Sequence, residues 1–123
     1  MPDRSAHLLQ AERNEAFLTR INTPDMPYRE WVVTVWFYIC VQYVDAFLTE
    51  KGHRQVVDHP DRFAKMQLHQ ETRSIFEDYE MLYKDSKEAR YQTTQYTSAD
   101  IQSIEQLYLK IRRHLRQTLG LPG

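Results

Sequence analysis

Glycine and cysteine are scarce in this sequence. The 123 residues include three glycines, of which Gly120 and Gly123 lie in the last four positions, and one cysteine, Cys40. So few turn-permissive residues argue against a fold of many strands and tight turns, and they favour long helices with short connections. A single cysteine excludes a disulfide framework and fits a reducing compartment.

A strong net charge and an N-terminal signal segment are also missing. The formal net charge is −1, so no global field draws the protein to DNA or to an acidic membrane. Residues 1–15 carry charges in every turn and lack the apolar core of a signal peptide. Gly-rich phosphate loops are absent, which excludes a P-loop or dinucleotide fold. These features predict a cytoplasmic protein.

The longest apolar stretch is residues 28–51, YREWVVTVWFYICVQYVDAFLTEK. From Trp31 to Val44 it carries no charge. A helix that is apolar on nearly its whole circumference belongs at the centre of a bundle, and the uncharged part is shorter than the ~20 apolar residues that a bilayer span needs. Gly52, just past the stretch, suits a C-terminal cap. The stretch therefore predicts the central helix of a soluble bundle, with no membrane partner.

Four further helices are predicted around it. The first runs from about Ser5 to Ile21, and the third is short, beginning at a cap on Asp58 or His59 and ending near Leu68. The fourth spans about Thr72 to Lys84 and continues to Tyr91 after a break at residues 85–86. The last begins at a capping box, residues 97–100, and ends at Gly120.

Polar segments connect these helices, and apolar residues face inward along them. The connections are residues 22–27, 53–62 and 92–96. The first helix carries an apolar stripe made of Leu8, Leu9, Ala16, Phe17 and Ile21. We predict an all-α fold: one domain over residues 1–123, an up-and-down bundle of about five helices.

A line of polar residues interrupts the central helix. Thr34, Tyr38, Gln42 and Asp45 recur every three or four positions, which places them on one face. Either this face makes satisfied hydrogen bonds to solvent and neighbouring helices, or it lines a polar groove. A buried Asp45 requires a basic partner, and Arg54, Arg62 and Arg90 are the candidates, with Arg90 preferred.

Four segments taken in order resemble a known family. They are W-x-V-T-V-x-F-Y at 31–38, Y-V-D-A-F-L at 43–48, G-H at 52–53 with H-x-x-R at 59–62, and S-x-E-A-R-Y at 86–91. Together they resemble a small prokaryotic HEPN-domain protein, over roughly Leu8 to Leu115. The resemblance implies a helical bundle that forms homodimers and acts in RNA metabolism, phage defence or toxin–antitoxin pairs, often beside a nucleotidyltransferase antitoxin.

The resemblance also implies two kinds of activity. Active members are metal-independent endoribonucleases with an Arg-x(4–6)-His motif; others bind nucleotides or partner proteins. The spacing occurs here as Arg54-x4-His59 and Arg62-x6-His69, a number of matches that chance alone supplies. His59 with Arg54 or Arg62 is the candidate catalytic set, because histidine transfers protons near neutral pH and arginine stabilises a phosphate. A helix cap or a structural hydrogen bond is the alternative role of His59.

Other chemistries find less support. No paired-cysteine or H-E-x-x-H pattern predicts a metal site, no cofactor is expected, and Cys40 lies in the most apolar segment, where a thiolate is disfavoured. A basic cluster in the last helix either contacts phosphates or complements the helix dipole; its members are Lys110, Arg112, Arg113, His114 and Arg116. Tyr91 and Tyr96, close to Arg90, are candidates for base stacking.

Three functions follow from these observations. We predict a module that binds nucleotide, RNA or a partner protein through Asp45, Arg90 and Tyr91. The alternatives are the metal-independent endoribonuclease and a structural helical adaptor without a ligand. A shared cleft for His59, Arg62, Asp45 and Arg90 would favour a site over an adaptor.

Overall fold

The computed structural model describes residues 2–91 and 96–123, and the part it describes is helical throughout. This confirms the all-α bundle. Six α-helices occur within these two ranges: α1 (Arg4–Ile21), α2 (Arg29–Glu50), α3 (His59–Met66), α4 (Gln70–Arg73), α5 (Phe76–Tyr91) and α6 (Ser98–Thr118). Of the predicted connections, the segment at 92–95 lies outside the described residues.

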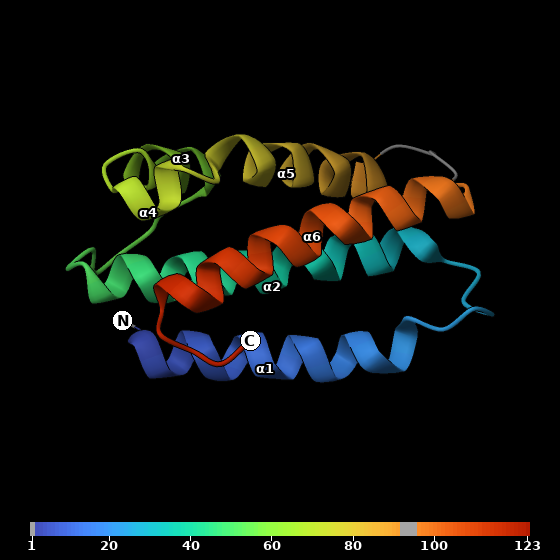
Figure 1. The fold of residues 1–123 in the computed structure, drawn as a ribbon, viewed down its shortest axis with the longest axis horizontal. Coiled ribbons are helices and arrows are strands. Elements are labelled where there is room, and N and C mark those ends of the chain that lie inside the picture. Colours follow the sequence, from blue (N-terminus) through green and yellow to red (C-terminus); the bar gives the residue numbers. More distant parts are fainter. Residues whose placement is uncertain (1, 92–95) are drawn as a thin grey trace.

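Helix α2 is the centre of the bundle. Helix α1 packs along one side of it, and α5 and α6 pack along two more (Figure 1). The largest buried side chains are mostly on α2 and include Trp36, which stacks on Tyr108 of α6 with ring centroids 5.6 Å apart. By length and composition α2 would be able to cross a membrane, but most of it is buried by its neighbours, which is consistent with a soluble protein.

Two glycines end the long helices as the sequence predicts. Gly52 has φ +94°, and the N–H groups of Gly52 and His53 donate to the carbonyls of Thr49 and Leu48. Gly120, with φ +74°, ends α6 in the same way. Paired bonds of this kind around a left-handed residue satisfy the last carbonyls of a helix, and only glycine adopts that conformation without strain.

The segment from 70 to 91 differs from its prediction. The chain breaks at Ser74 and Ile75, between α4 and α5, and no break occurs at residues 85–86. Ser86 stays helical because its hydroxyl donates to the carbonyl of Tyr83, and its small side chain is fully buried. The early break turns the predicted fourth helix into two, so the described chain has six helices rather than about five.

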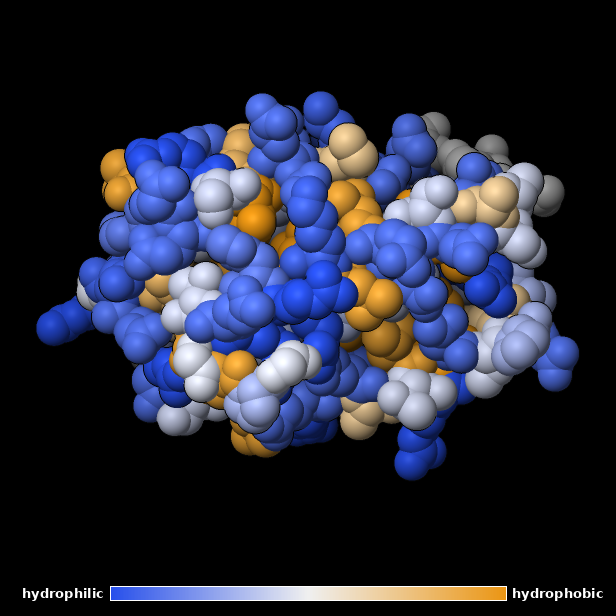
Figure 2. Space-filling model, in the orientation of Figure 1, coloured by the Kyte–Doolittle hydropathy of each residue, from blue (hydrophilic) through white to orange (hydrophobic). Residues whose placement is uncertain are grey.

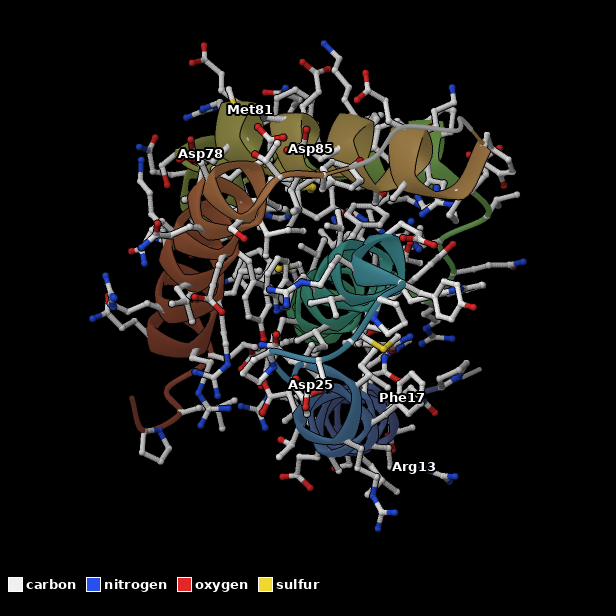
Figure 3. The ribbon with its side chains drawn as sticks, turned by 90° about the vertical axis from the view of Figure 1, so that its right-hand side faces the viewer. Arg13, Phe17, Asp25, Asp78, Met81 and Asp85 are labelled. Atoms are coloured by element: carbon white, nitrogen blue, oxygen red, sulfur yellow. The ribbon has the colours of Figure 1, made fainter. Side chains whose placement is uncertain are left out.

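The predicted stripe of α1 is wrong in part. Leu9, Ala16 and Phe17 are exposed, and the side that meets α2 carries Leu8, Ala11, Leu18 and Ile21 instead. Figure 3 shows Phe17 and Arg13 directed away from the bundle. Helix α1 lies at the edge of the bundle. Its inner side therefore also accommodates a polar residue, Glu15, whose carboxylate reaches Arg112 on α6.

Glu15 joins α1 to α6 through charged hydrogen bonds. Its carboxylate accepts from Arg112 at 2.9 and 3.3 Å and from the Tyr43 hydroxyl at 2.6 Å, and Tyr43 in turn accepts from Arg116 at 2.9 Å. Burial raises the pKa of Glu15, but the bonds from Arg112 and Tyr43 outweigh it, so the net pKa is lowered. Glu15 is therefore ionised in the folded protein.

The pKa of Glu15 is lower in the folded state than in the unfolded state, where it is near 4.5. The stability that this carboxylate contributes is therefore fully present above the unfolded-state pKa and is lost as pH falls through the folded-state pKa. We expect Glu15→Gln to lower the free energy of unfolding by about 1–2 kcal/mol at pH 7. The difference from wild type should shrink below pH 4 in urea titrations. A difference in unfolding free energy that stays constant over that pH range would contradict an ionised Glu15 in the folded protein.

Candidate functional site

A buried ion pair connects α2 to α3. Arg62 donates from Nε to one oxygen of Asp45 at 2.7 Å and from Nη2 to the other at 3.0 Å. The two residues are only 8% and 7% exposed. Such a bidentate pair satisfies a buried carboxylate and fixes its orientation. The sequence preference for Arg90 as the partner of Asp45 is therefore wrong, and Arg62, another of the three candidates, takes that place.

Local sequence explains why Arg62 reaches Asp45. Asp58 caps α3 by accepting from the N–H of Asp61 at 2.9 Å, and Pro60 occupies the first turn. This cap starts the helix so that Arg62, on its first turn, faces the last turns of α2. Asp58, and not His59, is the capping residue.

His59 extends the ion pair toward α5. Its Nδ1 lies 3.0 Å from Nη1 of Arg62, and its ring packs on Phe37 and Tyr83 with centroids 5.6 and 5.1 Å apart. An arginine can only donate, so Nδ1 is the acceptor and the proton of the neutral ring sits on Nε2. Burial, followed by the charges of Arg62 and Arg90, lowers the pKa of His59, which keeps the ring neutral near pH 7.

The candidate catalytic set is only partly assembled. Arg62 contacts His59 but is already bonded to Asp45, and the Nε2 atom of His59 carries a proton, so it donates rather than accepts. Arg54 is exposed and lines a small cavity of about 110 Å³ with Asp45 and His53, and no hydrogen bond joins it to His59 in the described residues. Neither predicted Arg-x(4–6)-His pair is a bonded pair there.

His69, the histidine of the Arg62-x6-His69 spacing, is bonded to another histidine. The Nε2 atoms of His53 and His69 lie 2.8 Å apart, and the His69 ring packs edge-on against Phe47. The pair joins the link after α2 to the start of α4. No arginine bonds His69 within the described residues, so the histidine pair is a structural contact.

Arg90 is arranged differently from Arg62. Its guanidinium lies over the rings of Tyr38 and Tyr91, 5.4 and 5.3 Å from their centroids, and it donates to the Ser86 hydroxyl at 3.0 Å. No carboxylate lies within ion-pair distance of it in ranges 2–91 and 96–123, and its buried Nε atom has no hydrogen-bond partner there. Aromatic rings hold the cation while leaving it able to bind an anion.

A cavity opens beside this arginine. It has a volume of about 310 Å³ and is lined by Glu30, Trp31 and Thr34 of α2 and by Ala89 and Arg90 of α5. Trp31 is 57% exposed and Tyr91 is 71% exposed. The cavity thus combines a cation, a carboxylate and the accessible ring of Trp31, and Tyr91 lies against Arg90 outside the lining. Such a composition is typical of ligand sites and interface hot spots.

The ion pair and the arginine site are neighbours. Phe37, which supports His59, lies next to Tyr38, whose ring is under Arg90, and the two rings are 5.6 Å apart. Of the predicted binding residues, Arg90 and Tyr91 therefore lie together, while Asp45 is buried behind them in the pair with Arg62. The cavity beside Arg90 is lined by none of His59, Arg62 and Asp45, so the shared cleft predicted for the four residues is not assembled there.

The polar line of α2 makes separate bonds along its length. Thr34 donates to the carbonyl of Glu30, Gln42 bonds His7 at 2.9 Å, Asp45 pairs with Arg62, and Tyr38 lies under Arg90. Satisfied bonds to neighbouring helices account for Gln42 and Asp45, and Thr34 bonds a carbonyl of its own helix. Tyr38, under Arg90, and Thr34, which lines the cavity beside Arg90, belong to the open site, so each of the two interpretations holds for part of the line.

The basic cluster of α6 is largely occupied within the chain. Lys110 pairs with Asp78 at 2.8 Å, Arg112 with Glu15, and Arg116 donates to the Pro122 carbonyl and to Tyr43. His114 bonds the carbonyl of Glu71 at 2.6 Å. These contacts hold α6 against the bundle, and they leave little of the cluster for phosphates. Tyr96 donates to the Asp85 carbonyl, and no hydrogen bond joins it to Arg90 in the described residues.

Metal and thiol chemistry have no group to support them in the described ranges. No three ligand side chains converge there on a metal position. Cys40 is fully buried, and burial raises the pKa of its thiol, so the thiolate is suppressed.

Sequence reasoning missed three residues of the arginine site. Tyr38 appeared only as a member of the polar line, and Trp31 and Ser86 appeared only within motifs. Trp31 lies seven residues before Tyr38, which places both on one face of α2. Ser86 lies one turn before Arg90. Those spacings were readable, but nothing in the sequence indicated that this face stays uncovered.

Comparisons with protein-family models, with curated proteins and with solved structures give no match. The HEPN resemblance therefore stays a prediction, and functional inference depends on the geometry of the site.

Proposed function

We propose that this protein is a helical binding module that holds a phosphate-bearing ligand with an aromatic base, a nucleotide or single-stranded RNA, between α2 and α5. The observation that carries the proposal is Arg90, a cation between two tyrosine rings that is not paired with a carboxylate in the described chain. Arg90 would bind the phosphate, while Tyr91 and Trp31 offer exposed faces for stacking.

The rest of the cavity suits the same ligand. Glu30 supplies an acceptor for amino or hydroxyl hydrogens of a base or ribose, and it restricts the number of phosphates that the cavity can hold. A cavity of about 310 Å³ admits one nucleotide unit and not a duplex. The neutral His59 behind it adds no charge at pH 7.

This proposal agrees with the predicted HEPN relationship, in which members without a working nuclease motif bind nucleotides or proteins. A cytoplasmic role in prokaryotic defence or a toxin–antitoxin pair, with a nucleotidyltransferase antitoxin as partner, remains part of the proposal. The adaptor alternative is less favoured, because an adaptor does not need an arginine stacked on tyrosines beside an open cavity.

Fluorescence anisotropy with a labelled single-stranded RNA of about eight nucleotides tests the proposal. We expect saturable binding that weakens as salt rises, with competition by mononucleotides and little by duplex DNA of equal length. Absence of saturable binding at low salt, with the protein folded by circular dichroism, would overturn it.

The nuclease alternative needs its own assay. RNA is incubated with the protein and with His59→Ala in the presence of EDTA. Because Arg62 is bonded to Asp45 and His59 carries its proton on Nε2, we expect binding without cleavage. Cleavage that survives EDTA and disappears in His59→Ala would instead establish the metal-independent endoribonuclease.

A homodimer is the proposed assembly, and it has a candidate surface. Several large apolar side chains are exposed on α1 and just before α2: Leu9, Phe17 and Tyr28. A second copy would bury them, since exposed aromatic clusters mark interfaces. Light scattering after size exclusion should give twice the chain mass of 14.8 kDa. Phe17→Glu should shift the protein toward monomer, and a wild-type monomer would contradict the assembly.

A further inference from the structure

A second cavity forms an open groove between α5 and α6 and shares no lining residue with the cavity at Arg90. Its volume is about 670 Å³, against about 310 Å³ for the cavity at Arg90. Apolar side chains form its floor, among them Met81, Ile104, Leu107 and Tyr96. Met81 is 56% exposed although it lies between two helices. Figure 2 shows hydrophobic surface between hydrophilic side chains on the face that α5 and α6 share.

The edges of the groove are acidic. Asp78, Asp85 and Glu88 follow α5, and Asp100 lies at the start of α6. Lys110 is the only cation of the lining, and its ammonium already pairs with Asp78 at 2.8 Å. Figure 3 shows Asp78, Met81 and Asp85 along α5 beside α6. The groove therefore concentrates negative charge on a chain whose net charge is only −1.

We infer that this groove docks a basic amphipathic helix of a partner protein, with apolar side chains on Met81, Ile104 and Leu107 and lysines or arginines along the carboxylate edges. Helix-in-groove recognition uses an apolar floor for anchors at helical spacing, and an exposed methionine adapts to such anchors. Charge complementarity selects a cationic helix over a neutral or acidic one.

The shape of the groove favours a chain segment over a small cation. A small organic cation would need an enclosed site with carboxylates on several sides, whereas this trough is open along the two helices and its carboxylates are spread over three turns of α5. Asp85 strengthens the argument, because no side-chain bond in the described residues neutralises it; Tyr96 bonds only its backbone carbonyl.

A synthetic helix provides the test. The probe is a labelled peptide of about 14 residues with leucines on one face and lysines on the other, long enough for four helical turns. Comparison peptides replace lysine by glutamate, or keep the composition and scramble the pattern. We expect saturable binding of the first peptide only. Equal binding of the scrambled peptide, full competition by spermidine, or no saturable binding would overturn the inference.

Variants locate the binding on the groove. Asp85→Asn with Glu88→Gln should weaken peptide binding about tenfold, and Met81→Gln about fivefold, since each removes one half of the recognition. Asp25→Asn is the matched control, an exposed carboxylate on the far side of the bundle (Figure 3). A double variant that binds like the wild type, in protein that unfolds at the same temperature, would contradict the proposed site.

The pH dependence gives a second readout. Burial, followed by the charge of Glu88, raises the pKa of Asp85 to about 6. Asp78, Glu88, Asp100 and Lys110 are the other charged groups that face the groove. Peptide affinity should therefore increase between pH 5 and 7, and this increase should be absent in Asp85→Asn. RNA binding at Arg90 should not follow the same profile, so the two proposals fail separately.

Discussion

Replacing Arg62 by alanine is expected to lower the free energy of unfolding by about 3–5 kcal/mol, because it leaves the Asp45 carboxylate buried without its partner. Asp45 is 7% exposed, and both of its oxygens accept from Arg62. The loss would be a large part of the roughly 5–15 kcal/mol of a typical domain. It should appear as a fall in Tm of roughly 10–25 °C in calorimetry.

Two variants control this prediction. Arg54→Ala, at an exposed arginine on the link before α3, should change stability by less than about 0.5 kcal/mol. Joint replacement of Asp45 by leucine and Arg62 by methionine should restore much of the loss, since an apolar pair of similar volume avoids the desolvation cost. A single Arg62→Ala variant as stable as Arg54→Ala would show that the pair does not hold α3 to α2.

Replacing Arg90 by glutamine is expected to weaken RNA or nucleotide binding tenfold or more, about 1.4 kcal/mol or above. The change removes the cation but keeps a polar, shorter side chain, and Ser86 remains as its neighbour. Because Arg90 has no carboxylate partner in the described residues, its loss exposes no buried charge, and the free energy of unfolding should change by less than about 1 kcal/mol. Binding and stability should therefore separate.

Lysine at this position distinguishes stacking from charge. Arg90→Lys keeps the positive charge but not the planar group that lies over Tyr38 and Tyr91. We expect intermediate affinity, with the salt dependence of the wild type. Wild-type affinity in Arg90→Gln, measured by anisotropy in protein of unchanged stability, would remove Arg90 from the site.

The fold could be predicted well because most of its helices are specified by residues within or next to each helix. The apolar circumference of α2, the capping box at Thr97 and the glycines at 52 and 120 each specify an element through its own residues, and all of them are found as expected. The break at Ser74 and the orientation of α1 were not predictable in this way. Both depend on which neighbour a helix packs against, and single-sequence periodicity does not contain that information.

The site could be predicted only as a set of residues. Asp45, His59, Arg62 and Arg90 were all identified as candidates, but their pairing was not. Arg62 and Arg90 are both arginines within reach of a polar face, and their roles differ because α3 buries Arg62 while α5 leaves Arg90 at a cavity. Exposure of Trp31 and Tyr38 on the mostly buried α2 likewise depends on which of its sides the neighbouring helices cover. Figure 3 shows α1, α5 and α6 around α2.

Trp31 offers the most direct test of the central claim, that a ligand binds beside Arg90. It lines the cavity and is 57% exposed, whereas Trp36, the other tryptophan, is buried against Tyr108. Single-stranded RNA is titrated into the protein while tryptophan fluorescence is recorded, with Trp31→Phe and Arg90→Gln as comparisons. The account predicts saturable quenching that Trp31→Phe abolishes and Arg90→Gln weakens at least about tenfold in affinity. RNA binding that leaves Trp31 fluorescence unchanged, or that Arg90→Gln does not affect, would place the ligand elsewhere and contradict it.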